Sequence, residues 1–159
     1  MSEERELTHL TGSGEARMVD VGDKETTRRE AVAEAVVVMP PDLAEKFLRG
    51  DLPKGDAPAV VRIAGIQGAK RTAELIPLCH PLPIDSVSIE LEATGHGIRA
   101  LASVSTHGRT GVEMEAMTAV SVAALALYDM VKSVERSVSI ETVRLLRKSG
   151  GRSGDWERS

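Results

Sequence analysis

A strictly alternating segment followed by a glycine-containing turn is the feature that most constrains the fold. In residues 86–92, Val, Ile and Leu alternate with Ser and Glu, which is the pattern of a strand with one buried face. Residues 94–97 have turn composition, and residues 98–106 predict a second strand that returns beside the first. The centre of the chain is therefore predicted to be a half-exposed antiparallel hairpin.

One strand and two helices are predicted ahead of this hairpin. Residues 29–39 are ambiguous, because two glutamates have helical spacing, but the valine-rich end of the segment favours a strand. A short helix is predicted for residues 43–49, where a glycine follows. Asp56 then caps a second helix, which we expect to reach about Leu75.

A long helix is predicted after the hairpin. Thr110 and Glu113 have capping-box spacing, and we expect the helix to reach about Glu135. Its predicted buried stripe is Met114, Met117, Ser121, Leu125, Tyr128 and Val131. A last strand, residues 138–146, precedes the Gly/Ser-rich segment 149–155. The resulting order, βαββαβ with an extra short helix, predicts an α+β ferredoxin-like fold with an antiparallel sheet and helices on one face.

Composition limits the core and the number of domains. The length of 159 residues suits one domain, and a hydrophobic content of 42% is sufficient for one core. Because aromatic residues make up only 2%, the core must consist of small aliphatic residues and Met. Gly65 and Gly68, inside the second helix, predict close packing against a neighbouring element. We therefore expect a single domain, 1–159, with flexible ends at 1–15 and 149–159.

Charge and cysteine content exclude several classes of protein. The net charge of -4 disfavours a general nucleic-acid binder. A single cysteine cannot form an internal disulfide, and the first residues are charged rather than apolar. The longest apolar run, residues 119–127, is shorter than the roughly 20 residues that a membrane span needs. We expect a cytoplasmic protein that binds neither nucleic acid nor membranes.

Two charged residues near the end of the long helix are candidates for proton transfer. Asp129 and Lys132 are three residues apart, so they share a helix face and can bracket one reacting group. The same spacing also suits a solvent-exposed ion pair without a function. Glu113 lies about 24 Å from Asp129 along the helix axis. One small ligand cannot contact both ends in one chain, so a site that uses both ends needs two subunits.

Basic residues in or beside loops are compatible with an anion site, although exposed Lys and Arg are common on any surface. Phosphates are the usual ligands of such a cation set. These residues are Lys54, Lys70, Arg71, Arg147, Lys148 and Arg152.

The segment 74–83, ELIPLCHPLP, places the only cysteine beside a histidine in a proline-stiffened connection. Cys79 and His80 could act as nucleophile and base or as metal ligands, but adjacent residues of an extended segment point to opposite sides. The other histidines lack ligand spacing, so we expect no protein-bound metal. A role in lining a pocket is the preferred interpretation for both residues.

Several motifs together match one family. They are MVDV (18–21), KGD (54–56), RIAGIQGAKRT (62–72), LIPLCHPL (75–82), TGVEMEAMTA (110–119), YDMVK (128–132) and RLLRKSGGRSGD (144–155). With these motifs, from about Leu7 to Asp155, the chain resembles the molybdenum cofactor biosynthesis protein C (cyclic pyranopterin monophosphate synthase) family. It departs from the usual pattern at two positions. Other members often have Lys where this chain has Arg152, and Pro53 precedes the lysine of the KGD motif.

This resemblance implies a lyase of molybdenum cofactor (molybdopterin) biosynthesis. Family members convert (8S)-3′,8-cyclo-7,8-dihydroguanosine 5′-triphosphate to cyclic pyranopterin monophosphate and release pyrophosphate. The substrate comes from the radical-SAM GTP cyclase of the pathway. The resemblance also implies a homohexamer, a trimer of dimers, with sites between subunits. No resident cofactor is implied, and Mg²⁺ can accompany the triphosphate.

The family motifs also imply a role for each candidate residue. The catalytic acid and base groups would be Asp129, Lys54 and Lys132. The residues that contact the base or sugar would be Leu78, Cys79, His80, Glu113, Met114 and Glu115. The phosphates would be held by Arg29, Lys70, Lys148 and Arg152.

Two other functions fit the same residues. The anion site would also serve a non-catalytic nucleotide-binding regulatory module of ferredoxin-like fold, since a fold does not fix a function. A structural partner of the neighbouring pathway enzyme would bind no small ligand. Ligand binding and pyrophosphate release distinguish these three functions.

Overall fold

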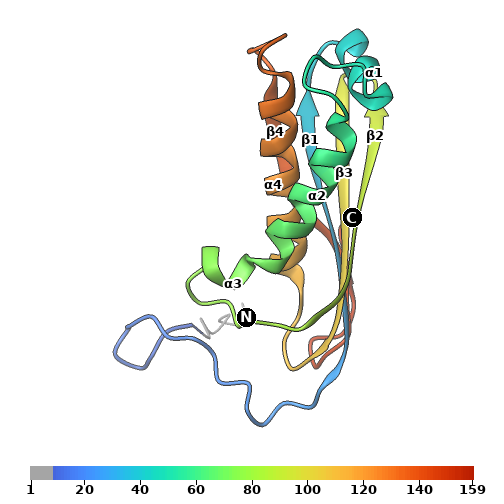
Figure 1. The fold of residues 1–159 in the computed structure, drawn as a ribbon. Helices are drawn as coiled ribbons and strands as arrows, with labels where there is room; N and C mark the ends of the chain where they lie inside the picture. Colours follow the sequence, from blue (N-terminus) through green and yellow to red (C-terminus); the bar gives the residue numbers. More distant parts are fainter. Residues whose placement is uncertain (1–8) are drawn as a thin grey trace.

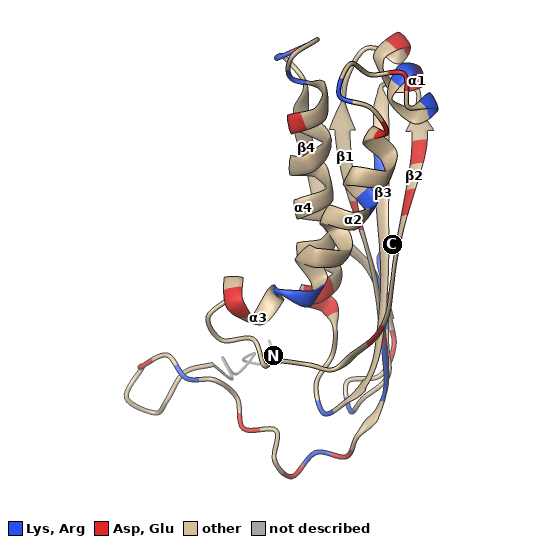
Figure 2. Cartoon of the chain, viewed as in Figure 1, with Lys and Arg blue, Asp and Glu red and all other residues tan. Residues whose placement is uncertain are grey.

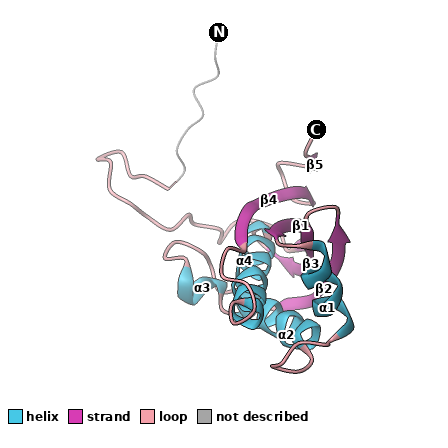
Figure 3. Cartoon of the chain, turned by 90° about the horizontal axis from the view of Figure 1, so that it is seen from above, coloured by secondary structure: helices cyan, strands magenta, loops and turns pink. Residues whose placement is uncertain are grey.

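A five-stranded antiparallel sheet with helices on one face forms the body of the protein in the computed structural model, which describes residues 9–159 (Figures 1 and 3). The elements are β1 (Thr27–Val38), α1 (Pro41–Arg49), α2 (Ala57–Lys70), α3 (Thr72–Leu75), β2 (Ile84–Thr94), β3 (Gly97–Gly108), α4 (Glu113–Val131), β4 (Ser139–Ser149) and β5 (Trp156–Glu157). The strand order is β2-β3-β1-β4-β5. The order of the first four strands confirms the predicted ferredoxin-like fold, to which α1, α3 and β5 are additions.

The predicted hairpin and the predicted first strand are both present. β2 and β3 pair antiparallel, with Val87 opposite Val104, and they continue beyond the predicted bounds at both ends. β1 is a strand, as its valine-rich end indicated, and it lies between β3 and β4. Side chains on one face of β1 meet α4, because the strand is central and that helix covers it.

α4 is the central helix of the core; its predicted buried face is correct at Val131 but wrong at Met114 and Leu125. Met114 is 40% exposed and Leu125 is 61% exposed. The residues that are fully buried are mainly small: Ala116, Ala119, Val120, Ala123, Ala124, Leu127 and Val131. α4 contacts both α2 and the sheet, so its buried surface is broad, and alanines allow both neighbours to approach closely.

The ends of the two long helices also differ from the prediction. At the start of α4 the N-cap is Val112 and no side chain caps the helix, so Thr110 does not form the predicted capping box. α4 ends at Val131, four residues before the expected end. α2 ends at Lys70, because the backbone turns at Arg71 before the short α3 begins. The predicted cap of α2 is confirmed: Asp56 Oδ1 accepts a hydrogen bond from Ala59 N at 3.1 Å.

The glycines of α2 allow that helix to lie against its neighbours. A Cβ at Gly65 would lie 2.8 Å from Ile89 Cδ1 of β2 and 3.2 Å from the carbonyl oxygen of Ala119 in α4. A Cβ at Gly68 would lie 3.2 Å from the carbonyl oxygen of Thr118. Such distances are shorter than ordinary van der Waals contact. The predicted close packing is therefore confirmed, and it fixes α2 against α4.

The sheet face opposite the helices contains a buried carboxylate. Glu34 of β1 is 3% exposed and accepts hydrogen bonds from Arg99 Nε of β3 at 2.5 Å and Arg144 Nε of β4 at 2.6 Å. Burial alone would raise the pKa of Glu34, but the hydrogen bonds from Arg144 and Arg99 bring it below its usual value. One side chain thus links the three central strands.

The described N-terminal segment lies outside the sheet-and-helix body, whereas the C-terminal segment joins the sheet. Residues 9–26 form an extended arm at the lower end of the molecule (Figure 1). Of the ends predicted to be flexible, residues 1–8 lie outside the described residues, whereas 149–159 form a turn and β5. By length and mean hydropathy α4 could cross a membrane, but it is a core helix between α2 and the sheet.

Candidate functional site

A cavity of about 760 Å³ lies at the lower end of the molecule. Its walls come from the N-terminal arm, the start of β1, the connection between β3 and α4, and the turn after β4. We call it the anion cavity because its cationic side chains come from four separate segments: Lys24, Arg29, Arg109, Lys148 and Arg152. Three carboxylates, Asp23, Glu25 and Glu113, also line it.

Three of the four predicted phosphate ligands lie together in this cavity. Arg29, Lys148 and Arg152, to which the resemblance assigns phosphate binding, all line it. Arg29 is only 9% exposed, and its Nε has no hydrogen-bond partner within residues 9–159. Lys148 Nζ lies 3.8 Å from Glu113 Oε1. A buried guanidinium with unused donors is costly unless an anion completes its hydrogen bonds.

A second cavity, of about 400 Å³, continues from the first. The residues predicted to contact the base or sugar all line it: Leu78, Cys79, His80, Glu113, Met114 and Glu115. We therefore call it the base cavity. Lys24, Thr110, Gly111 and Glu113 line both cavities, so the two form one bent site. The proline-stiffened connection between α3 and β2 positions Cys79 and His80 against the first turn of α4.

Burial raises the pKa of two groups in the base cavity. Glu115 is 4% exposed, and burial, together with the nearby charge of Glu113, raises its pKa to about 7. Burial also raises the pKa of the Cys79 thiol, and the Glu115 carboxylate adds to that shift. The thiol is therefore protonated at neutral pH and is a poor nucleophile, which favours its predicted role of lining the pocket.

The raised pKa of Glu115 predicts a pH-dependent stability. Between pH 4.5, the ordinary value, and about pH 7, the folded state retains a proton that the unfolded state has released, so the free energy of unfolding falls as the pH rises. Glu115→Gln removes this dependence. When the pH is raised from 5 to 8, the free energy of unfolding of the wild-type protein is expected to fall, relative to that of Glu115→Gln, by on the order of 1–3 kcal/mol.

Urea unfolding of both proteins at pH 5 and pH 8, at equal protein concentration, measures this difference. Glu74→Gln, which changes an exposed carboxylate on α3, is the control. Parallel pH profiles for wild type and Glu115→Gln contradict the prediction.

The predicted catalytic residues meet at the opposite end of the molecule. Lys132 Nζ lies 2.6 Å from Asp129 Oδ1, as the spacing of the two residues predicted. Lys54, in the connection between α1 and α2, lies with its Nζ 3.6 Å from Asp129 Oδ2 and donates a hydrogen bond to the Asp129 carbonyl oxygen at 2.7 Å. The structure thus brings all three predicted catalytic residues together.

This cluster contains both a proton acceptor and a proton donor at neutral pH. The hydrogen bond from Lys132, with the charges of Lys132 and Lys54, holds the pKa of Asp129 below its usual value. The hydrogen bond to Asp129 raises the pKa of Lys132 in return. At neutral pH Asp129 is therefore a carboxylate and Lys132 an ammonium, so a proton acceptor and a proton donor are in contact, although their ion pair makes Asp129 a weaker base and Lys132 a weaker acid.

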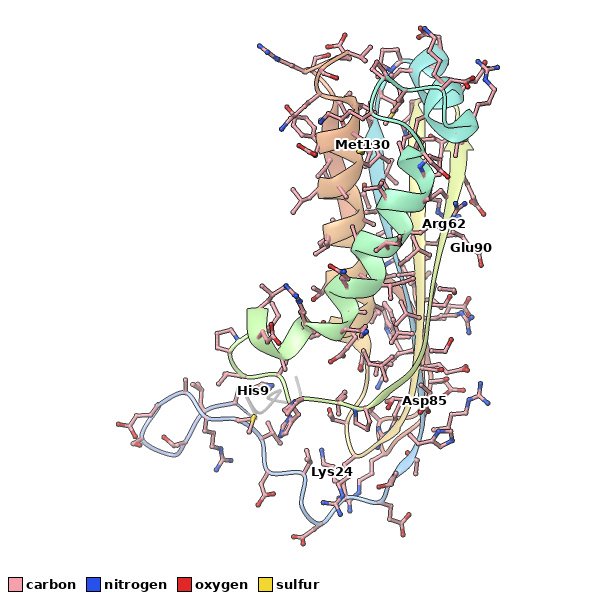
Figure 4. The ribbon with its side chains drawn as sticks, in the orientation of Figure 1. His9, Lys24, Arg62, Asp85, Glu90 and Met130 are labelled. Atoms are coloured by element: carbon pink, nitrogen blue, oxygen red, sulfur yellow. The ribbon has the colours of Figure 1, made fainter. Side chains whose placement is uncertain are left out.

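The cluster and the cavities are separated by the length of α4. In Figure 4 Met130, the neighbour of Asp129, lies at the upper end of α4. Lys24 of the anion cavity lies on the N-terminal arm, at the lower end of the molecule. The charged residues of the helix lie only near its two ends, and its centre is uncharged (Figure 2). A rise of 1.5 Å per residue places Glu113 about 24 Å from Asp129, so no small ligand spans both within one chain.

Lys70, the fourth predicted phosphate ligand, lies apart from the other three. It lines a separate hollow of about 320 Å³ beside β2 with Ile66, Leu82 and Asp85. Lys24 and Arg109 line the anion cavity but were not predicted, because isolated loop residues have no periodic signal. Within the described residues, no group of three or more His, Cys, Asp or Glu side chains could hold a metal ion.

Comparisons with known proteins identify the family. The family model described as MoaC family matches residues 18–151. A protein of Chloroflexus aurantiacus named cyclic pyranopterin monophosphate synthase is 55% identical, over 96% of this chain and 95% of its own length. Proteins of the same name from Corynebacterium efficiens and a Nostoc species are 54% and 55% identical, over 95% and 94% of this chain and 97% and 90% of their own lengths. The chain, with its paired cavities and its separate Asp129 cluster, belongs to the MoaC family.

Proposed function

We infer that this protein is a cyclic pyranopterin monophosphate synthase. It is a lyase of molybdenum cofactor biosynthesis that converts (8S)-3′,8-cyclo-7,8-dihydroguanosine 5′-triphosphate to cyclic pyranopterin monophosphate and pyrophosphate. The names of its relatives support this inference. The observation that carries it is the anion cavity, in which a buried arginine with an unpartnered Nε lies beside further cations.

The continuous cavities suit the two parts of this substrate. Its triphosphate needs a set of cations, which Arg29, Lys148 and Arg152 supply together with Lys24. Its guanine-derived ring needs a half-buried surface with a few polar groups, which His80 and Glu115 supply next to Leu78, Cys79 and Met114. The triphosphate thus lies in the anion cavity, with the ring directed into the base cavity.

The reaction consists of proton transfers and a displacement at phosphorus. Opening the purine ring and closing a pterin ring move protons between nitrogen, oxygen and carbon. Closing the cyclic phosphate bonds a substrate hydroxyl oxygen to the α-phosphorus, breaks the bond to the β-phosphate oxygen and expels pyrophosphate. Asp129 accepts protons and Lys132 donates them, with Lys54 beside them. The overall reaction is not a redox reaction, so it requires no redox cofactor, and any Mg²⁺ arrives with the triphosphate.

The complete site is formed between subunits. Since α4 separates the cavities from the Asp129 cluster by about 24 Å, the cluster of one protomer must serve the cavities of another. A homohexamer built as a trimer of dimers, as expected of the family, provides such contacts. The substrate is supplied by the radical-SAM GTP cyclase of the pathway, and this small-molecule pathway suits the expected cytoplasmic location.

A non-catalytic nucleotide-binding module would need the cations but not the cluster. The Asp129, Lys132 and Lys54 cluster supplies a base and an acid in contact, which binding alone does not need. The enzyme is therefore the better-supported function.

Incubation of the purified protein with the cyclo-dihydro-GTP substrate tests this function. We expect one pyrophosphate to be released for each pterin formed, measured by coupled phosphate detection and by oxidation of the product to a fluorescent pterin. GTP, which lacks the carbon–carbon bond between ribose C3′ and base C8, is the control substrate and should release no pyrophosphate. Saturable substrate binding without pyrophosphate release contradicts the enzyme and supports the regulatory module.

A further inference from the structure

Arg29 occupies an unusual environment for a cation. It extends from β1 into the anion cavity and is 9% exposed. Its Nη2 donates a hydrogen bond to the carbonyl oxygen of Arg109 at 3.4 Å, and its Nε has no partner within residues 9–159. The guanidinium is therefore held in place by its surroundings with part of its donor set unused, as expected of a group that awaits an anion.

The turn after β4 forms the surface against which this guanidinium lies. Gly150 and Gly151 both have positive φ, +89° and +80°, so the backbone of the turn lies in a region that favours glycine. A Cβ at Gly151 would lie 1.7 Å from Arg29 Nη1 and 2.6 Å from Arg29 Cζ. The guanidinium thus occupies the space that any side chain at Gly151 would need.

Gly150 has a different neighbour, which separates its role from that of Gly151. A Cβ at Gly150 would lie 2.2 Å from the backbone oxygen of Arg28, so a side chain there would displace the β1 main chain. At Gly151 the atoms that must move belong to the end of the Arg29 side chain. A substitution at Gly151 therefore displaces the cation, whereas one at Gly150 disturbs the sheet.

Hydrogen bonds within the turn hold Gly151 in this position. Gly150 N donates to Asp155 Oδ1 at 3.2 Å, and Gly154 N donates to the Gly151 carbonyl oxygen at 3.2 Å. Lys148, which also lines the cavity, donates a hydrogen bond to Ser153 Oγ of the same turn. The turn that presents Arg152 to the cavity and bonds to Lys148 of β4 is thereby also the support for Arg29.

We propose that Gly151 is a positioning residue for phosphate binding: because it has no side chain, the Arg29 guanidinium can lie in the anion cavity, where it binds the substrate triphosphate. This proposal rests on the proposed function, because it takes the ligand of the cavity to be a phosphate chain. It extends that function by assigning to the SGGRSGD turn a steric role toward a residue of β1.

Binding of inorganic triphosphate to Gly151→Ala tests the proposal. Trp156, the only tryptophan, pairs with Lys148 across β4 and β5, so its fluorescence provides a binding signal. We expect triphosphate to bind Gly151→Ala about 10- to 100-fold more weakly than wild type, as expected for loss of hydrogen bonds to a charged group. Gly154→Ala is the matched control, since Gly154 also has positive φ, +64°, but a Cβ there would meet no atom within 4 Å.

A double variant distinguishes positioning from general damage to the fold. If Gly151 acts through Arg29, then Arg29→Ala with Gly151→Ala binds triphosphate no more weakly than Arg29→Ala alone. Equal melting temperatures of Gly151→Ala and Gly154→Ala show that the turn is intact. If Gly151→Ala does not fold, Gly151→Asn replaces it, because asparagine tolerates positive φ, and the same loss is expected.

Triphosphate binding by Gly151→Ala equal to that by Gly154→Ala overturns the proposal, as do losses that add in the double variant. Absence of triphosphate binding by the wild-type protein has a different meaning, because it overturns the phosphate role of the cavity itself.

Discussion

Replacing Asp129 by asparagine is expected to lower kcat for pterin formation by about 10²- to 10⁴-fold, which is the range for loss of a general base or acid. The amide cannot accept the protons that the carboxylate accepts, and it no longer holds Lys132 in its ion pair. KM should change little, because the proposed site holds the triphosphate in the cavities rather than at Asp129. Steady-state kinetics with the cyclo-dihydro-GTP substrate measure both constants.

The free energy of unfolding of Asp129→Asn should stay close to that of the wild type, since exposed ion pairs contribute little to folding. Asp51→Asn is the matched control: this aspartate lies in the same connection as Lys54 and forms an exposed ion pair, with Arg49 Nε 3.2 Å from its Oδ2. Asp51→Asn should retain near-wild-type kcat. A wild-type kcat in Asp129→Asn removes the catalytic role assigned to the cluster.

Mixing two inactive variants is expected to restore about a quarter of wild-type activity when the variants damage opposite ends of α4. In a dimer of Lys54→Ala and Arg29→Ala subunits, one site combines both defects and the other is intact. Random pairing makes about half of the dimers mixed, and half of the sites in these are intact. Co-expression with two affinity tags and measurement of pyrophosphate release gives this fraction.

Lys54→Ala mixed with Asp129→Asn is the control for this experiment. The Lys54 Nζ and Asp129 Oδ2 atoms are 3.6 Å apart in one chain, so both variants damage the same end. Every site in the mixed dimer then has one defect, and no activity returns. Equal restoration in the two mixtures, or none in either, contradicts a site shared between subunits.

The order of the elements followed from the sequence because their patterns are local. The alternation in β2, the turn after it and the glycine that ends α1 depend on neighbouring residues only. The buried face of α4 did not follow, because α4 meets two partners and its largest apolar residues, such as Leu125, remain on the outer side. Which face of an apolar helix is buried depends on tertiary packing that periodicity does not contain.

The candidate site was predictable to a different extent at each end. The contact of Asp129 with Lys132 follows from helical spacing, but their contact with Lys54 depends on how the α1–α2 connection folds. Arg29, Lys148 and Arg152 were assigned through family motifs, and the fold brings them together from β1, β4 and the turn after it. Lys24 and Arg109 were missed because no local pattern distinguishes them from other exposed loop cations.

In the proposed assembly, the length of α4 fixes the distance between the cavities and the Asp129 cluster of each protomer. One extra residue near Ala123 would rotate everything beyond it by about 100° and shift it by about 1.5 Å, which would take Asp129 away from Lys54. The same insertion in the turn between β2 and β3 would leave that spacing intact. Natural variation in chain length should therefore be tolerated in the hairpin turn and rejected within α4.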